Sequence, residues 1–208
     1  MHQFDPLYAG LMLIAMLVCS WLLRGTQKAL SLTAQQKLGL GVGAFCGAMI
    51  GAKLPFVLSD WSGLLSGLAW LSDGKTIVLG LVGGYFGVEV AKWALDVRIK
   101  VGDSFAVPVA VAVAIGRLAC FEAGCCYGVP TSMPWGVAFP TALDDPAAWR
   151  HPTQLYESTF HFSSAVVLLL LSRRELFQGQ LIKLYILAYL ATGSYLKPFA
   201  RSRGCGGV

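Results

Sequence analysis

The sequence predicts an all-α membrane protein, a polytopic bundle of about six transmembrane helices forming a single integral domain over residues 1–208. Hydrophobic residues make up 56% of the chain, charged residues make up only 13%, and the mean hydropathy is +0.64. A soluble domain of this size cannot cover its surface with so few charges, so lipid is the expected solvent. The apolar residues also fall into runs of about 20, the length that crosses a hydrocarbon core of about 30 Å.

Apolar runs of this kind follow one another along the whole chain. We predict spans at residues 7–23, 38–58, 76–95, 105–121, 154–171 and 181–199. The first run follows Asp5 and Pro6 without a basic segment, which favours a retained span over a cleaved signal peptide. Pro108 is expected to interrupt the fourth span, because a proline inside a helix removes a backbone hydrogen bond.

The basic residues predict how the bundle is oriented. They gather around the loops that follow the first, third and fifth spans, at Arg24, Lys28, Lys37, Arg98, Lys100, Arg173 and Arg174. Short loops rich in Lys and Arg remain cytoplasmic, so the N-terminus is predicted to lie outside. Residues 59–74 and 122–152 then become interfacial segments on the outer face, a depth that suits Trp61 and Trp70.

The net charge of the chain favours lipid partners over nucleic acid. The 16 Lys and Arg residues outnumber the 11 Asp and Glu residues, which gives +5. This excess suits anionic phospholipid headgroups, whereas the basic residues sit singly in short loops and form no patch for nucleic acid. We therefore expect membrane phospholipids as partners and exclude nucleic acid.

Three cysteines, Cys120, Cys125 and Cys126, lie close together in the outer loop region. Thiolates suit zinc, but this spacing does not repeat the paired Cys-x2-4-Cys pattern of zinc sites. A disulfide and a packed turn of small residues are the alternatives. The spacing favours both of these over a metal site, and the packed turn over the disulfide.

Charged residues inside the predicted spans are candidate functional residues, because each costs about 2.5 to 3.5 kcal/mol on insertion scales. Arg117, near the outer end of the fourth span, either snorkels to the interface or binds a lipid phosphate with its planar fork of donors. Lys53 has the same two interpretations. Glu89 and Lys92 lie three residues apart, so they can pair on one helix face, and a role in lipid chemistry is the alternative.

Four glycines of the third span recur at the spacing of helix neighbours, namely Gly80, Gly83, Gly84 and Gly87. Such spacing is typical of close helix packing, and less often of a backbone that opens toward a ligand. We keep Gly83 and Gly84 as candidate substrate-binding residues.

The densest polar cluster is Arg-His-Pro-Thr-Gln-Leu-Tyr-Glu at residues 150–157, at the outer entrance to the fifth span. Its proline suits the first turn of a helix, which puts Gln154 and Glu157 on one helix face. His151 titrates near neutral pH and a partly buried glutamate can be raised toward it, so the cluster can orient a phosphate ester and move a proton. An interfacial cap anchored by Tyr156 is the structural alternative.

A series of short motifs runs through the chain in a fixed order. It comprises Tyr8-Ala9-Gly10, Gly51-Ala52-Lys53, Gly116-Arg117-Leu118, Gly124, Tyr127-Gly128, Pro134-Trp135-Gly136, Phe139-Pro140 and the string at 150–157. Together these motifs resemble the prolipoprotein diacylglyceryl transferase family, and the likeness covers most of the chain.

The resemblance implies a multi-pass enzyme of the bacterial inner membrane. Such an enzyme moves the diacylglyceryl group of phosphatidylglycerol to the lipobox cysteine thiol of a prolipoprotein signal peptide and releases glycerol phosphate, without a metal or an organic cofactor. We predict Arg117, His151 and Glu157 as catalytic residues, with Arg117 holding the phosphate. The predicted substrate-binding residues are Lys53, Gly83, Gly84, Glu89, Gln154 and Tyr156.

The sequence departs from the family pattern at several polar positions. A histidine is replaced by Val82, an asparagine by Cys120, an acidic residue by Cys125, and an arginine and a glutamate of the sixth span by Ser194 and Pro198. These changes keep two alternatives open. One is a paralogue acting on another phospholipid or acceptor, and the other is a catalytically silent lipid-binding protein.

Overall fold

The structure, a computed structural model, describes residues 6–59, 76–142 and 145–196. Apart from Ser59, the predicted interfacial segment at residues 59–74 lies outside the described residues. The same holds for Pro198 at the end of the sixth predicted span.

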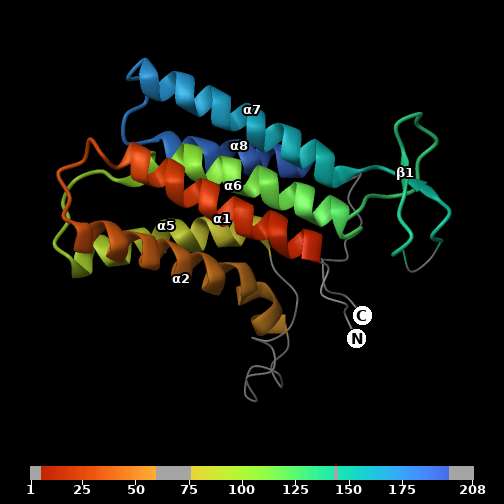
Figure 1. Cartoon of the computed structure of the whole chain (residues 1–208), viewed down its shortest axis with the longest axis horizontal. Coiled ribbons are helices and arrows are strands. Elements are labelled where there is room, and N and C mark those ends of the chain that lie inside the picture. Colours follow the sequence, from red (N-terminus) through yellow and green to blue (C-terminus); the bar gives the residue numbers. More distant parts are fainter. Residues whose placement is uncertain (1–5, 60–75, 143–144, 197–208) are drawn as a thin grey trace. The chain divides into compact units, whose positions relative to one another are not determined.

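The described residues form a series of helices, with a longer segment between α6 and α7 (Figure 1). The helices are α1 (Pro6–Thr26), α2 (Ala34–Ser59), α5 (Ile77–Ala94), α6 (Gly102–Glu122), α7 (Thr153–Arg173) and α8 (Leu181–Leu196). The first five of these contain windows long and apolar enough to cross a membrane, and α8 contains a shorter apolar helix at Leu181–Gly193. The prediction of an all-α bundle with about six spans is confirmed.

The expected interruption of the fourth span at Pro108 is wrong, because α6 runs through Pro108 as one helix. The helix begins at Gly102, so the proline falls in its second turn. A proline cannot donate to the carbonyl four residues before it, which here belongs to Ser104. That carbonyl instead accepts a hydrogen bond of 2.8 Å from the Thr26 hydroxyl at the end of α1. The neighbouring helix thus replaces the bond that the proline removes.

Two short strands interrupt the segment between α6 and α7, an element that the all-helical prediction did not include. The strands β1 (Val137–Ala138) and β2 (Trp149–Arg150) pair antiparallel, with Val137 opposite Arg150. This ribbon leads directly into the start of α7.

The helices fall into two compact units, and each is described by itself. The first unit contains α1, α6, α7, α8 and the two strands, and the second contains α2 and α5. The single integral domain over the whole chain stays a prediction.

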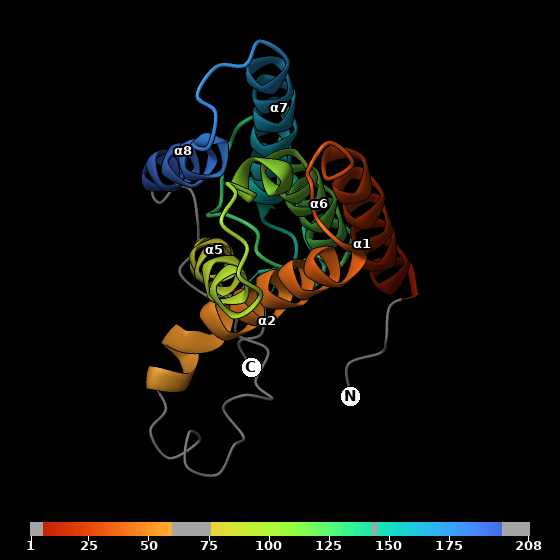
Figure 2. The ribbon, with the colours of Figure 1, turned by 90° about the vertical axis from the view of Figure 1, so that its left-hand side faces the viewer.

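In the second unit, α2 and α5 lie side by side (Figures 1 and 2). Their contact consists of facing glycines. A Cβ atom added to Gly83 would overlap backbone atoms of Gly47 and Gly51. One added to Gly84 would lie 3.3 Å from the Ala44 carbonyl oxygen. Small residues allow helix backbones to approach closely in lipid, so the glycine spacing is explained by packing.

The close approach of α2 and α5 predicts a large effect for one methyl group. A Cβ atom at Gly47 would lie 2.8 Å from the Gly87 Cα atom, whereas one at Gly41 of the same helix would have no heavy atom within 4 Å. We expect Gly47→Ala to lower the free energy of unfolding by about 1 to 3 kcal/mol, the typical cost of overpacking. Gly41→Ala should change it by less than about 1 kcal/mol. Unfolding in detergent micelles measures both, and equal stabilities would contradict the packing.

In the first unit, the N-terminal end of α6 and the turn before α8 are joined by Asp103. Its carboxylate accepts hydrogen bonds from the backbone N–H groups of Gly179 and Leu181, the latter at 2.9 Å. An acidic side chain at a helix N-terminus satisfies free donors and suits the helix dipole. Because Thr26 reaches Ser104 at the same end, this end joins α1, α6 and the α7–α8 turn. The C-terminal end of α6 and the start of α7 lie at the opposite end.

Candidate functional site

The centre of the candidate site is an ion pair between α6 and α7. The Arg117 Nε atom donates to the Glu157 Oε2 atom at 2.8 Å, and the Nη2 atom of the same guanidinium donates to the same oxygen. The two side chains are only 13% and 15% exposed. The Tyr189 hydroxyl of α8 also donates to Glu157 Oε2, at 2.7 Å. Three helices therefore meet at one carboxylate.

The pair argues against the snorkelling interpretation of Arg117, because the guanidinium is bound to Glu157 of α7 and the side chain is only 13% exposed. Arginine stays protonated at any accessible pH, so a buried guanidinium needs an anion beside it. Glu157 accepts from the Nε and Nη2 atoms, and the guanidinium also interacts with the side chains of Cys120 and Tyr189. This geometry can hold a permanent cation inside the bundle.

The helix contact beside the pair is fixed by a further hydrogen bond. The hydroxyl of Ser158, a buried residue, donates to the Ala114 carbonyl oxygen at 3.0 Å. Ser158 follows Glu157 directly, and Ala114 lies one turn before Arg117. The bond therefore sets the register of α6 against α7 at the level of the ion pair.

A buried histidine that the sequence prediction missed lies one turn beyond Glu157. His161 has no exposed surface, and its Nδ1 atom lies 2.8 Å from the Tyr185 hydroxyl of α8. Its ring centroid is 4.6 Å from that of Tyr189. Among the described residues the His161 Nε2 atom has no hydrogen-bond partner. The spacing of four residues from Glu157 was the available signal, since it places both side chains on one helix face.

The string at residues 150–157 contacts different parts of the site. Gln154, which has no exposed surface, donates from Nε2 to the Cys125 carbonyl oxygen at 2.5 Å. The Thr153 hydroxyl donates to the Cys126 carbonyl oxygen at 2.7 Å. The first turn of α7 therefore holds the loop that follows α6.

His151 and Tyr156 form a second polar group at the start of α7. The His151 Nδ1 atom lies 3.1 Å from the Tyr156 hydroxyl, and the Trp135 indole N–H donates to the same hydroxyl at 2.9 Å. Behind them, the fully buried Arg150 guanidinium lies 5.1 Å from the Tyr127 ring centroid, a cation–π contact.

The remaining predicted site residues belong to the second unit. Glu89 and Lys92 form an ion pair of 2.9 Å on α5, which is the structural pairing weighed for them. Lys53 is buried on α2, and Gly83 and Gly84 lie in the contact between α2 and α5. Their roles in substrate binding stay predictions.

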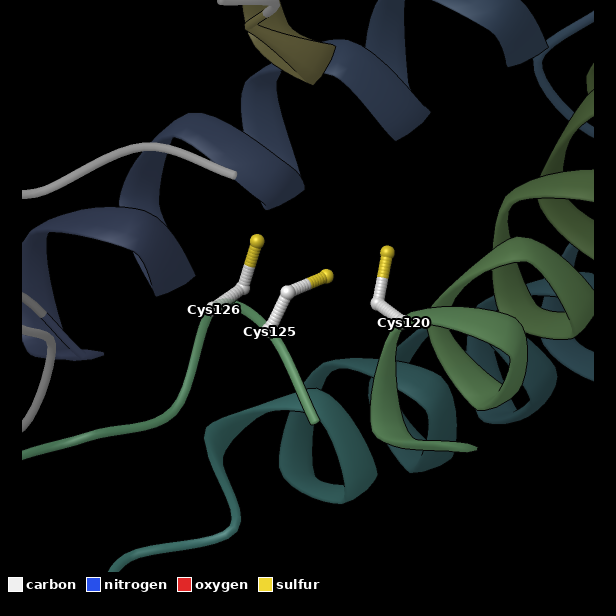
Figure 3. A group of neighbouring side chains, drawn as sticks. All are labelled: Cys120, Cys125 and Cys126. Atoms are coloured by element: carbon white, nitrogen blue, oxygen red, sulfur yellow. The ribbon is translucent and has the colours of Figure 1, made fainter. Parts of the chain in front are cut away.

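The three outer cysteines lie together (Figure 3), Cys120 on the last turns of α6 and the other two on the loop that follows. Their Sγ atoms are all within 4.8 Å of one another. The chain turns back at Gly124, whose φ is +63°, and the Cys125 N–H donates to the Cys120 carbonyl oxygen at 3.1 Å.

The oxidation states of these cysteines differ. Cys120 and Cys125 are thiols, and Cys126 is disulfide-bonded. A side-chain hydrogen bond with Cys120, followed by burial, raises the pKa of the Cys125 thiol above its usual range. Because Cys120 and Cys125 are both free, no disulfide joins two of these three cysteines, and the prediction of a disulfide within this loop is wrong.

Comparison with known proteins identifies the family. The model of the prolipoprotein diacylglyceryl transferase family matches residues 6–196. A phosphatidylglycerol–prolipoprotein diacylglyceryl transferase of Clostridium tetani is 31% identical over 97% of this chain and 82% of its own length. One of Methylococcus capsulatus is 32% identical over 90% of this chain and 76% of its own length.

A further relative is phosphatidylglycerol–prolipoprotein diacylglyceryl transferase 2 of Clostridium perfringens. It is 26% identical over 96% of this chain and 80% of its own length. No solved structure matches the chain. The family match over most of the chain, together with these relatives, shows that this multi-pass membrane protein belongs to the prolipoprotein diacylglyceryl transferase family.

Proposed function

We propose that this protein transfers the diacylglyceryl group of phosphatidylglycerol to the thiol of a lipobox cysteine in prolipoproteins. We place the reaction at the outer face of a bacterial cytoplasmic membrane, with the N-terminus outside. The names of the relatives support the reaction class. The observation that carries the proposal is the Arg117 guanidinium, held inside the bundle by Glu157.

The reaction needs stabilisation of a leaving phosphate. The sulfur of the acceptor forms a bond to the terminal glycerol carbon of the diacylglyceryl group. The bond from that carbon to the phosphate oxygen breaks, and its electron pair leaves with glycerol phosphate. Negative charge grows on the phosphate oxygens during this step, so a preorganised guanidinium in a site of low dielectric lowers the barrier. Arg117 has this role in our proposal, and Glu157 positions it.

The acceptor thiol must also lose its proton, because the thiolate is the nucleophile. Val82 stands where the family resemblance implies a histidine, so the base has to come from elsewhere in this chain. We propose that His151, bonded to Tyr156, accepts the proton. In the orientation that we propose, the start of α7 and His151 lie at the outer face, where a signal peptide would enter.

The wild-type reaction tests the proposal. Purified protein in vesicles containing phosphatidylglycerol is mixed with a lipobox peptide, and the peptide mass is followed. We expect a mass gain of one diacylglyceryl group, and none for the matched peptide in which serine replaces the lipobox cysteine. A product formed only in vesicles of another phospholipid would contradict this proposal and support the alternative, a paralogue that acts on another phospholipid. Binding of phosphatidylglycerol without any product would replace it by the silent lipid-binding protein, which the substitution at Val82 favours.

A further inference from the structure

We propose that Cys120, Cys125 and Cys126 form a redox-gated binding site for one thiophilic metal ion of the Zn²⁺ or Cu⁺ type. The site lies at the outer end of α6 and does not depend on the proposed transferase function. It rests on the position of three sulfur atoms, on the hydrogen bonds that hold their backbone, and on the oxidation state of Cys126.

The sulfur positions suit a single ion. The three Sγ atoms lie within 4.8 Å of one another, and all three side chains are half-buried, so an ion can reach them (Figure 3). With Zn–S bonds of about 2.3 Å, the sulfurs of a tetrahedral site are ~3.8 Å apart and those of a trigonal site ~4.0 Å apart. A contraction of at most about 1 Å per pair therefore closes the site, which side-chain rotation can supply. Soft thiolate ligands select Cu⁺ and Zn²⁺ over hard cations.

The backbone that carries the two loop cysteines is fixed from outside the loop. Gln154 and Thr153 bind the carbonyl oxygens of Cys125 and Cys126, at 2.5 and 2.7 Å. The Thr141 hydroxyl donates to the Gly124 carbonyl oxygen, at 2.5 Å. Ligands held by an outer layer of hydrogen bonds lose less conformational freedom when a metal binds.

Two backbone conformations bring the sulfurs to one side. Cys126 has a φ of +61°, a left-handed conformation that is uncommon for a residue with a side chain. Gly124 needs its left-handed φ, and a Cβ there would also meet the Thr141 side chain. The two turns explain how a Cys-x4-Cys-Cys spacing converges although it differs from the usual zinc spacing.

Electrostatics favour thiolates at this place. Three thiolates around Zn²⁺ carry a net charge of −1, or −2 around Cu⁺. Arg117 lies one helical turn before Cys120 on α6, on the same side of the helix. Its guanidinium forms an ion pair with one carboxylate, that of Glu157. A nearby permanent cation lowers the cost of the excess negative charge.

The disulfide of Cys126 makes the site conditional. A disulfide sulfur is no thiolate ligand, so the oxidised protein offers only Cys120 and Cys125. A dithiol reductant that transfers two electrons and two protons breaks the S–S bond and frees the third thiol. The metal ion then displaces the thiol protons as it binds. Disulfides are stable on the outer side of a bacterial membrane, so reduction there acts as the gate.

The test uses the full chain in detergent micelles and Cd²⁺, a thiophilic probe whose thiolate complexes absorb in the near ultraviolet. We expect the reduced, metal-free protein to bind one Cd²⁺ per chain with this absorption. Zn²⁺ and Cu⁺ should each compete for the site, and their relative affinities identify the preferred ion. The oxidised protein should bind at least about 10-fold more weakly, because loss of a ligand costs no less than the loss of an outer-layer partner.

Matched variants locate the site. Cys120→Ser and Cys125→Ser should each weaken Cd²⁺ binding by at least about 10-fold. Cys46→Ser, at an exposed cysteine of α2, should leave binding unchanged. Failure of the reduced wild type to bind Cd²⁺ overturns the proposal, and so does equal binding by reduced and oxidised protein. The comparison of the two redox forms uses no substitution, so it stands even where a serine variant does not fold.

Discussion

Replacing Arg117 with lysine is expected to reduce diacylglyceryl transfer at least about 100-fold while the protein stays folded. Lysine keeps the positive charge that Glu157 needs. It does not keep the planar fork, in which Nε and Nη2 bind one carboxylate oxygen and which, in our proposal, also binds the phosphate. Initial rates with a lipobox peptide in phosphatidylglycerol vesicles measure the effect. Arg117→Ala removes the charge as well and should abolish transfer.

The control for this prediction is an arginine outside the proposed site. Arg98 pairs with Asp96 at 3.1 Å, and both side chains are more than 80% exposed, at 88% and 81%. Such a surface pair contributes at most about 1 kcal/mol, so Arg98→Lys should transfer at the wild-type rate. Wild-type activity in Arg117→Lys would show that a single positive charge is enough for transfer, without the planar fork. Full activity in Arg117→Ala would show that Arg117 takes no part in the reaction.

The convergence of Arg117 and Glu157 was predictable from their rarity. A charge in a span must face the bundle interior and find a partner, so two lone charges of opposite sign on neighbouring spans are expected to meet. The helix positions were also predictable, because an apolar run of about 20 residues has the length of a membrane-spanning helix. Neither inference needs the packing angle of the helices.

The aromatic and histidine contacts around the pair were not predictable from single spans. Tyr185, Tyr189 and His161 lie in runs that hydropathy treats as ordinary membrane helix. Their roles depend on how α8 is rotated against α7, which side-chain packing decides after both helices exist. Only the spacing from Glu157 to His161 carried a local signal.

The role of Gln154 shows a different limit. Its side chain is fixed by a backbone carbonyl, that of Cys125. Every residue has a backbone carbonyl, so the sequence does not indicate which carbonyl oxygen will accept the hydrogen bond from Gln154. The cysteine spacing gave no sign that three Sγ atoms would lie within 4.8 Å of one another, since the left-handed turn at Cys126 is unusual for a residue with a side chain.

Glu157→Leu is expected to lower the free energy of unfolding by about 3 to 5 kcal/mol, because it leaves a buried guanidinium without its anion. It also removes the acceptor of the Tyr189 hydroxyl. Unfolding in detergent micelles measures the loss. The matched control is Asp96→Asn, where the carboxylate is 81% exposed beside Arg98, itself 88% exposed, and a loss of at most about 1 kcal/mol is expected.

The double substitution of Arg117→Met with Glu157→Leu separates stability from chemistry. An apolar pair of similar volume replaces a buried ion pair at little cost and often stabilises, so the double variant should regain most of what Glu157→Leu loses. It should still transfer no diacylglyceryl group, because the proposed phosphate ligand is gone. A double variant as unstable as Glu157→Leu would mean that the stranded charge is not what destabilises the single variant. Glu157 would then stabilise the bundle mainly through its bond to Tyr189.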